Sequence, residues 1–246
     1  LTIPIVEGER WFFGKLNVAT IALFDRRIDP YYGAPQSVAS HAFIERPGRT
    51  GFFLEVPPLH PVLASLALSG FGAAHREGMK LLSRTNAVIA LLRDGFLPDD
   101  EGGTVSLREG GKRLSIRYPL GATHAEAMRE AMKVSARIQL AAGAHEVRTL
   151  HKDPVVVRGE RDIRFIDERP FGPNLLGVFT AHQMGGCAAG ADPKVSVVDG
   201  NLRHHHLANL WVFDGSVFPT SLGVNPQLSI LGIVSASAER MIASKT

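Results

Sequence analysis

Cysteine, long apolar runs and an excess of either charge are all scarce in this sequence of 246 residues. The one cysteine, Cys187, excludes an internal disulfide and fits a reducing compartment, so we expect a cytoplasmic protein. No stretch of about 18 apolar residues is present, which predicts no transmembrane segment. The net charge is only +3 and the basic residues are scattered, which argues against nucleic-acid binding.

The dinucleotide-binding pattern GxGxxG is also missing. The segment Gly70-Phe-Gly72-Ala-Ala-His75 imitates it but has no third glycine. The residues before that segment read as a helix, whereas the pattern follows a strand in Rossmann domains. The sequence therefore contains no Rossmann loop for the pyrophosphate of a cofactor.

Three consecutive histidines, His204, His205 and His206, invite a metal interpretation. On an extended chain they point to alternating faces, and no cluster of Cys, Asp or Glu stands near them at ligand spacing. We therefore predict that the sequence has no metal site.

Strand formers, helical periodicity and breakers predict the order of the elements. The clearest helix covers residues 123–142, with Thr123 as its N-cap, Glu126 three residues later and Gly143 as its stop. The other predicted helices are 59–68, 75–82 and 226–243. The predicted strands are 16–24, 36–44, 51–56, 86–93 and 210–213, with a hairpin that pairs 104–107 with 114–118.

Strands and helices do not alternate as βαβ units before about residue 175, which favours an α+β fold: an antiparallel sheet with helices packed on it. Residues 155–173 are charged and irregular, and we expect them to cross between domains. After this segment the sequence predicts glycine-rich turns, a strand and a final helix. The sequence thus predicts one domain over residues 1–175 and a segment of a different domain over 176–246.

A histidine opens the glycine-rich turn His182-Gln-Met-Gly-Gly-Cys187. Oxidation of an alcohol needs a base near the hydroxyl proton while hydride leaves the adjacent carbon, and a neutral imidazole titrates in the right range. Gly185 and Gly186 let a backbone and a cofactor approach closely. Taken alone, His182 could equally satisfy the hydrogen bonds of a turn.

An asparagine followed by proline stands in the sequence Gly223-Val-Asn-Pro-Gln227. Proline restricts the backbone of Asn225 and places its amide at the start of the final helix. That amide can donate to a substrate oxygen that gains negative charge, although Asn225 could also be a plain helix cap.

Two further candidates lie elsewhere in the sequence. Asp214 and Gly215 follow the predicted buried strand 210–213, and the glycine lets backbone amides face a ligand. Glu55 stands among apolar residues just before Pro57 and Pro58. It is a candidate for a buried acid in a substrate pocket, and the alternative is a surface acid on an edge strand.

The residues of the segments 182–187, 210–220 and 223–227, and the order of these segments, resemble the C-terminal signature of the glucose–methanol–choline (GMC) family of flavin oxidoreductases. The segments 25–36 and 91–95 resemble the branch of long-chain alcohol oxidases and cholesterol-oxidase-like members. The resemblance covers 180–242 closely and 14–150 more loosely. Most of the flavin site of that family lies outside this sequence.

The resemblance implies oxidation of an alcohol, a CH–OH donor, by hydride transfer to FAD. It implies that His182 is the base, that Asn225 orients the oxygen, and that Asp214, Gly215 and Gln227 contact the flavin. Residues 1–175 would form the substrate-binding domain. Residues 176–246 would complete an FAD-binding α/β domain whose N-terminal half lies in the same gene or in a second chain.

Two other classes stay open at this stage. The chain could be a non-catalytic fragment or subunit that needs a second chain for FAD. It could also resemble the hydroxynitrile lyases of the same family, which keep flavin without net redox chemistry. The expected substrate in the first reading is a small-molecule alcohol, with a hydrophobic one favoured.

Overall fold

The computed structural model describes residues 11–68, 70–97, 100, 102–108 and 112–244. It divides into two compact units, each assembled from separate stretches of chain. Unit 1 comprises the residues up to 15, 93–119 and those from 180 onward, and unit 2 comprises 16–92 and 120–179. The change of unit after residue 179 lies close to the boundary near 175 that the sequence predicts. The sequence did not predict that residues up to 15 and 93–119 belong to the same unit as the C-terminal segment.

Unit 2 is built on a six-stranded sheet in the order β3-β4-β5-β2-β8-β9, in which every pair is antiparallel. Its strands are β2 (Asn17–Leu23), β3 (Ala39–Ser40), β4 (Phe52–Glu55), β5 (Thr85–Leu92), β8 (Glu146–Thr149) and β9 (Val156–Val157). The long pairing of β2 with β5 forms the centre. The predicted α+β class with an antiparallel sheet is confirmed, while the strand predicted at 36–44 is reduced to the two residues of β3.

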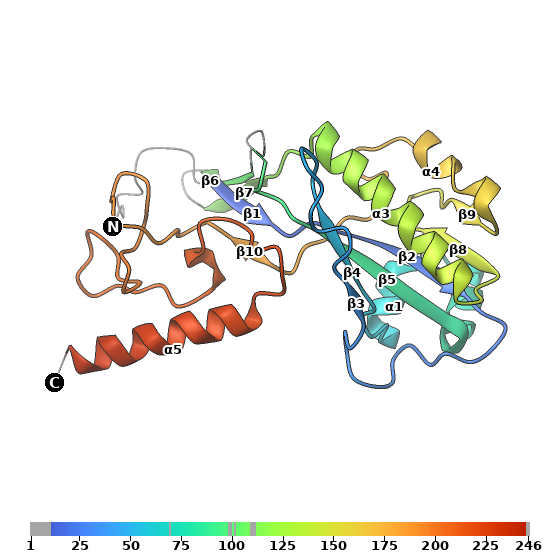
Figure 1. Ribbon diagram of the computed structural model, residues 1–246, viewed down its shortest axis with the longest axis horizontal. Helices are drawn as coiled ribbons and strands as arrows, with labels where there is room; N and C mark the ends of the chain where they lie inside the picture. The colour runs from blue at the N-terminus through green and yellow to red at the C-terminus, as the bar shows by residue number, and fades with distance from the viewer. Residues whose placement is uncertain (1–10, 69, 98–99, 101, 109–111, 245–246) are drawn as a thin grey trace. The chain divides into compact units, whose positions relative to one another are not determined.

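Helix α3 (Ala122–Ala141) covers one face of this sheet (Figure 1). Its alanines at 127, 131 and 136 have no exposed surface, and such small side chains let the helix lie close to the strands. Gln139 reaches the sheet, since the hydroxyl of Thr20 donates to its Oε1 over 2.7 Å and its Nε2 donates to Oδ1 of Asn86 over 3.3 Å. Thr20 and Asn86 therefore mark the face that α3 covers.

The start of α3 differs from the prediction in one detail. Its N-cap is Gly121, and the Nδ1 of His124 accepts a hydrogen bond from the Gly121 amide, so Thr123 is not the cap. A histidine at the third helical position can reach back to this amide, as glutamate does in a capping box. Gly143 ends the helix with a φ of +96°, as predicted.

The opposite face of the sheet lies under helix α1 (Pro61–Ala67), with α2 (Ala73–Lys80) and the short η1 (Leu82–Arg84) following it. A buried cluster joins α1 to β5 through Leu59, Ala64, Leu82 and Ala87. Because alternate residues of a strand face opposite sides, Ala87 lies on the face away from Thr20 and Asn86. The helices predicted at 59–68 and 75–82 are confirmed.

Residues 155–173 stay within unit 2, so the prediction that they cross between domains is wrong. They form β9, the single turn η3 (Glu160–Asp162) and the short helix α4 (Phe165–Glu168). Charged residues tie this segment to α3, since Arg137 pairs with Glu160 and Lys133 pairs with Asp167. The charges thus hold the segment against the helix.

Unit 1 contains a four-stranded sheet in the order β10-β1-β6-β7. Its strands are β1 (Trp11–Gly14), β6 (Gly103–Arg108), β7 (Arg113–Arg117) and β10 (Gln183–Met184). The predicted hairpin is confirmed as β6 and β7. The hydroxyl of Tyr118 accepts a hydrogen bond of 2.8 Å from the amide of Gly14, which ties the end of β7 to β1.

The C-terminal part of unit 1 carries the single turn η4 (Gly215–Val217) and helix α5 (Gln227–Ala243). The final helix is confirmed, although Pro226 is its N-cap and not its first residue. The prediction of a buried strand at 210–213 is wrong: Trp211 makes one isolated bridge with Arg203, and the segment is half-buried. A strand needs ladder partners, and the described residues supply only the chain around 202–204 beside it. None of the described helices combines the length and the apolar character that crossing a bilayer requires.

Candidate active site

His182 immediately precedes β10 of the unit 1 sheet. Strand β10 pairs with β1, with Gln183 opposite Gly14, and the amide of Lys15 donates to the carbonyl oxygen of His182 over 3.2 Å. The amide of His182 donates to the hydroxyl of Thr180 over 3.3 Å. The backbone of His182 is therefore held on both sides by its neighbours in unit 1.

The imidazole of His182 is half-buried, and its Nδ1 is buried without a hydrogen-bond partner among the described residues. Burial lowers the pKa of His182 below its ordinary value, and the positive charge of Lys15 lowers it further. The ring is thus neutral at neutral pH. A buried ring nitrogen without a partner is uncommon in a folded protein, and its explanations include an ordered water, an ion and a catalytic role.

Lys15 is a residue of this site that sequence reasoning did not single out. Its side chain is fully buried, which is unusual for a lysine. The one sequence signal is its position, because it interrupts the strand formers that run from Trp11 to Leu23. A lone lysine inside such a run is a candidate for a functional charge.

The glycine-rich turn after His182 packs beside η4. The amide of Cys187 donates to the carbonyl oxygen of Ser216 over 3.0 Å, and the amide of Ala189 donates to that of Val217 over 2.8 Å. Gly185 has a φ of +87°, a conformation that favours glycine. The structure thus brings together the histidine turn and the Asp214 segment, which are about thirty residues apart.

Asp214 caps η4, since its Oδ1 accepts a hydrogen bond of 2.8 Å from the amide of Ser216. The next residue, Gly215, lies where three segments meet. A Cβ at Gly215 would lie 3.1 Å from Cδ1 of Ile230 on α5 and 3.6 Å from the carbonyl oxygen of Gln183 on β10. Glycine at this position therefore allows η4 to contact both β10 and α5.

Asn225 and Gln227 are exposed and flank the N-cap of α5. The N-cap itself is Pro226, whose side chain makes no capping hydrogen bond, so Asn225 stands one residue before the position that the cap interpretation gives it. The loop before Asn225 packs on Arg93, because a Cβ at Gly223 would lie 2.6 Å from Nε of Arg93. Arg93 is a second residue that the sequence did not reveal.

Glu55 lies on β4 of unit 2, and it is only 4% exposed. It stands opposite Ile89 of β5, which stands opposite Ala19 of β2, so the three residues form one row on the face away from α3. Because β3 covers the edge of β4, the alternative of a surface acid on an edge strand is wrong. Its role in a substrate pocket stays a prediction.

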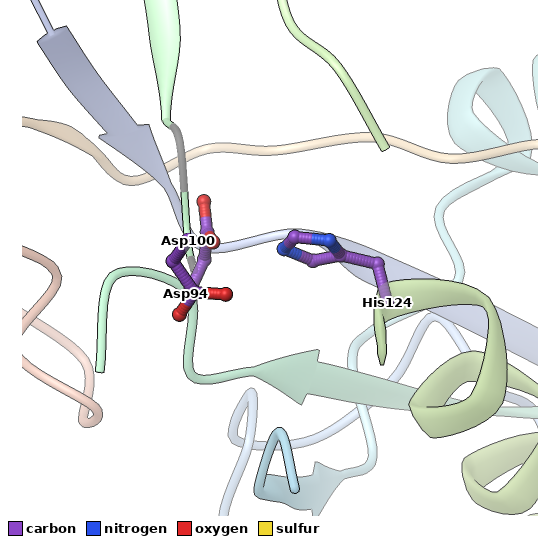
Figure 2. A group of neighbouring side chains, drawn as sticks. All are labelled: Asp94, Asp100 and His124. Carbon is purple, nitrogen blue, oxygen red and sulfur yellow. The ribbon is translucent and has the colours of Figure 1, made fainter. Parts of the chain in front are cut away.

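Asp94 and Asp100 belong to the turn after β5 in unit 1 (Figure 2). The Oδ2 of Asp100 accepts hydrogen bonds of 2.9 Å from the amides of three residues, Gly95, Phe96 and Leu97. His124, also drawn in Figure 2, belongs to unit 2 and forms the helix cap described above. Each of Asp100 and His124 thus has a structural function within its own unit.

The histidines at 204–206 also have structural partners. The Nδ1 of His204 accepts hydrogen bonds from the amides of His206 and Leu207 at 3.1 and 3.2 Å. The Nε2 of His205 shares a hydrogen bond of 2.9 Å with the hydroxyl of Ser196. These contacts hold a turn, and the prediction that this triplet binds no metal stays a prediction.

The fold and the arrangement of the C-terminal segments are those of a flavin oxidoreductase of the GMC type. The family model of GMC oxidoreductases matches residues 98–233, more than half of the chain. The chain therefore belongs to the GMC oxidoreductase family.

Several relatives are similar over much of the chain. An uncharacterized GMC-type oxidoreductase of Mycobacterium tuberculosis is 31% identical over 93% of this chain and 35% of its own length. A long-chain-alcohol oxidase of Arabidopsis thaliana is 30% identical over 72% of this chain and 24% of its own. A cholesterol oxidase of Acinetobacter baumannii is 44% identical over 28% of this chain and 12% of its own. The chain thus spans about a third, or less, of the length of these relatives.

Solved structures show the same fold. Pyridoxine 4-oxidase from Mesorbium loti superposes with a TM-score of 0.60 at 20% identity, over 94% of this chain and 43% of that one. Formate oxidase from Aspergillus oryzae, in a structure that concerns its FAD modification, gives 0.60 at 16% identity, over 96% and 47%. At these identities the likeness concerns the fold.

Proposed function

We propose that this chain supplies the substrate-oxidising side chains of an FAD-dependent alcohol oxidase or dehydrogenase, with His182 as the base and Asn225 as the group that orients the alcohol oxygen. The observation that carries the proposal is the half-buried imidazole of His182, whose buried Nδ1 has no partner among the described residues. Burial and the charge of Lys15 lower its pKa, which favours the neutral ring. A neutral ring can accept the proton of a hydroxyl group, whereas an imidazolium cannot.

The surroundings of His182 suit this task. Burial, and after it the positive charge of Lys15, lowers the pKa of His182 and so favours the neutral ring before the substrate binds. The hydrogen bonds to Lys15 and Thr180 fix the backbone from which the ring of His182 extends, and positioning is a large part of catalysis. Asn225 is exposed, and the N–H groups of its side-chain amide are suited to donate to the substrate oxygen as negative charge develops there.

The residues around η4 fit one side of an FAD molecule. A Cβ at Gly186 would meet only Cβ of Ser216, at 4.0 Å, so a group can approach the backbone of this turn closely. Asp214 and Gln227 are exposed, and Gln227 begins α5, a helix end that favours negative charge. FAD, when bound, supplies the acceptor for the hydride. The residues that would hold it here are Asp214, Gly215 and Gln227.

The relatives support the reaction class. Several of them are named as oxidases of long-chain alcohols or of cholesterol, which are compounds with a CH–OH group. Because the chain spans about a third of the length of such relatives, we also propose that the remaining FAD contacts come from an N-terminal region, in the same gene or in a second chain.

The test is His182→Ala in the FAD-loaded protein, followed by anaerobic mixing with an alcohol and measurement of flavin bleaching. Loss of a general base slows the reduction about 10²–10⁴-fold. FAD content, measured from the visible spectrum of the purified variant, should remain that of the wild type. His206→Ala is the matched control, because His206 is an exposed histidine of the same unit.

A His182→Ala protein that is reduced at the wild-type rate would exclude His182 as the base. A flavin that no alcohol bleaches, together with cyanide release from a cyanohydrin, would favour the lyase alternative over oxidation. A protein that never retains FAD alone, but does so with its N-terminal region added, would show that this chain is the incomplete part of the enzyme.

A further inference from the structure

An apolar pocket of about 480 Å³ lies on the sheet face of unit 2 that is away from α3. Its floor is formed by Ala19 and Ile21 of β2 and by Ala87 and Ile89 of β5. These residues are cross-strand partners, Ala19 with Ile89 and Ile21 with Ala87, so the floor is a continuous patch of the central strands. All of the residues that line the pocket belong to unit 2.

Small side chains create the volume. Three alanines, Ala19, Ala67 and Ala87, and Gly177 stand in the lining at positions where larger apolar residues would fill the space. Side chains that pack against one another normally leave little space between them, so the small residues at these positions keep the pocket open. Its volume falls within the range of about 300–1,000 Å³ that is typical of small-molecule sites.

The outer wall of the pocket is the apolar surface of α1. Leu63 and Leu66 line the pocket and yet are 54% and 79% exposed, so the mouth opens to solvent along this helix. Exposed leucines that border a cavity mark a binding site more often than isolated ones do. A ligand in the pocket would cover them.

The lining determines the class of ligand. No lining side chain is charged or carries a hydrogen-bonding group. A charged or strongly polar group placed there would lose its hydration without compensation, which costs several kcal/mol. An uncharged hydrocarbon portion would instead remove apolar surface from water at every methylene that enters.

We propose that this pocket binds the hydrocarbon portion of an uncharged, water-insoluble organic molecule, and that α1 forms its entrance. Resting on the proposed function, that molecule is the alcohol substrate, so the pocket sets a preference for long apolar chains. The acid Glu55 lies in the same cross-strand row as Ile89 and Ala19, which places a polar side chain of the same sheet face beside the floor.

Binding is measured without oxidation, on the FAD-loaded protein, with the apolar dye Nile red. Linear alkyl methyl ethers displace the dye, and they have no hydroxyl group to oxidise. The half-displacing concentration should fall about fourfold with each added methylene until the pocket is filled. Glycerol, which is hydrophilic, should not displace the dye.

Two matched pairs of variants locate the site on α1. Leu66→Asp places a charge at the mouth, and Val62→Asp places the same charge on the same helix at a residue that does not line the pocket and is 69% exposed. Ala67→Trp fills the pocket, and Ser65→Trp adds the same side chain at an exposed position. Leu66→Asp and Ala67→Trp should weaken ether binding about tenfold or more, and the controls should change it less than about twofold. Leu66 is mostly exposed, so its substitution is not expected to affect folding.

Equal effects of each variant and its control, or displacement without dependence on chain length, would overturn the inference. A dye that does not bind at all would also overturn the inference, because another part of the protein would then fill the pocket. The proposed function can fail separately. Ether binding could weaken as expected in Leu66→Asp and Ala67→Trp while flavin reduction does not depend on His182. That combination would support the pocket and exclude His182 as the base.

Discussion

The hydroxyl of Thr220 donates a hydrogen bond of 2.9 Å to the carbonyl oxygen of Gly95, a residue 125 positions earlier in the chain. Gly95 has a φ of +83°, and a Cβ there would lie 2.4 Å from Oγ1 of Thr220 and 2.7 Å from Cδ1 of Phe13. Three residues after Thr220, Gly223 packs on Arg93, and the loop then continues to Asn225. The turn after β5 thus supports the loop that carries the candidate oxygen-orienting residue.

Gly95→Ala should therefore destabilise unit 1. The positive φ alone costs about 1–2 kcal/mol for a residue with a Cβ, and the contacts with Thr220 and Phe13 add to that cost. Gly143→Ala is the control, because Gly143 has a φ of +96° and nothing within 4 Å of its Cβ. Chemical denaturation of both variants measures the difference, and equal losses would mean that the close approach to Thr220 does not matter.

Gln139 is the polar link between α3 and the sheet, and it is 2% exposed. Gln139→Leu should lower the free energy of unfolding by about 1–3 kcal/mol, because it leaves the buried hydroxyl of Thr20 without its acceptor. The double variant Thr20→Val with Gln139→Leu should recover part of that loss. Denaturation of the two single variants and the double variant completes the cycle, and strict additivity would show that the two side chains are not coupled.

The pH dependence of flavin reduction should reflect His182. Because its pKa is lowered, the base is already neutral at neutral pH, and the rate should fall only as the pH drops through this lowered value. Lys15→Met removes one cause of the lowering and should move the inflection to higher pH. Lys194→Met, at an exposed lysine of the same unit, should leave the profile unchanged. An inflection that is insensitive to Lys15→Met would assign it to another group.

His151 should make unit 2 sensitive to acid. Burial, aided by Arg169 and Arg129, lowers its pKa from 6.5 to about 4, and its Nδ1 lies 2.8 Å from the hydroxyl of Thr149. Between these two values the unfolded chain binds a proton that the folded state does not. Stability is therefore fully present above pH 6.5, declines as the pH falls toward about 4 and is level below that. His151→Gln should flatten this decline in thermal unfolding curves, and an unchanged slope would assign it to other groups.

The sequence predicts those helices and strands whose side-chain pattern is regular along the chain. The apolar runs of β2 and β5 and the periodicity of α3 are visible in the sequence because each buries a regular set of side chains. The strand expected at 210–213 was not formed, since a strand depends on neighbours that no local pattern reveals. The N-cap of α3 was missed because His124 supplies the contact that is usually made by glutamate.

The candidate site divides in the same way. Short motifs contain His182, Asp214 and Asn225, so the sequence alone identifies them as candidates. Lys15 and Arg93 act through contacts with segments far away in the sequence, and their significance appears only when the chain is folded. The pocket under α1 could not be predicted either, because a cavity arises from small residues on several elements together.

The interleaving of the two units has a practical consequence for protein engineering. The chain changes unit four times, after residues 15, 92, 119 and 179. A chimera that exchanges the six-stranded sheet with that of a relative therefore needs four junctions, not one splice near residue 175. A single crossover would instead build each unit partly from one parent and partly from the other. Most members of such a library should therefore fail to accumulate as folded protein.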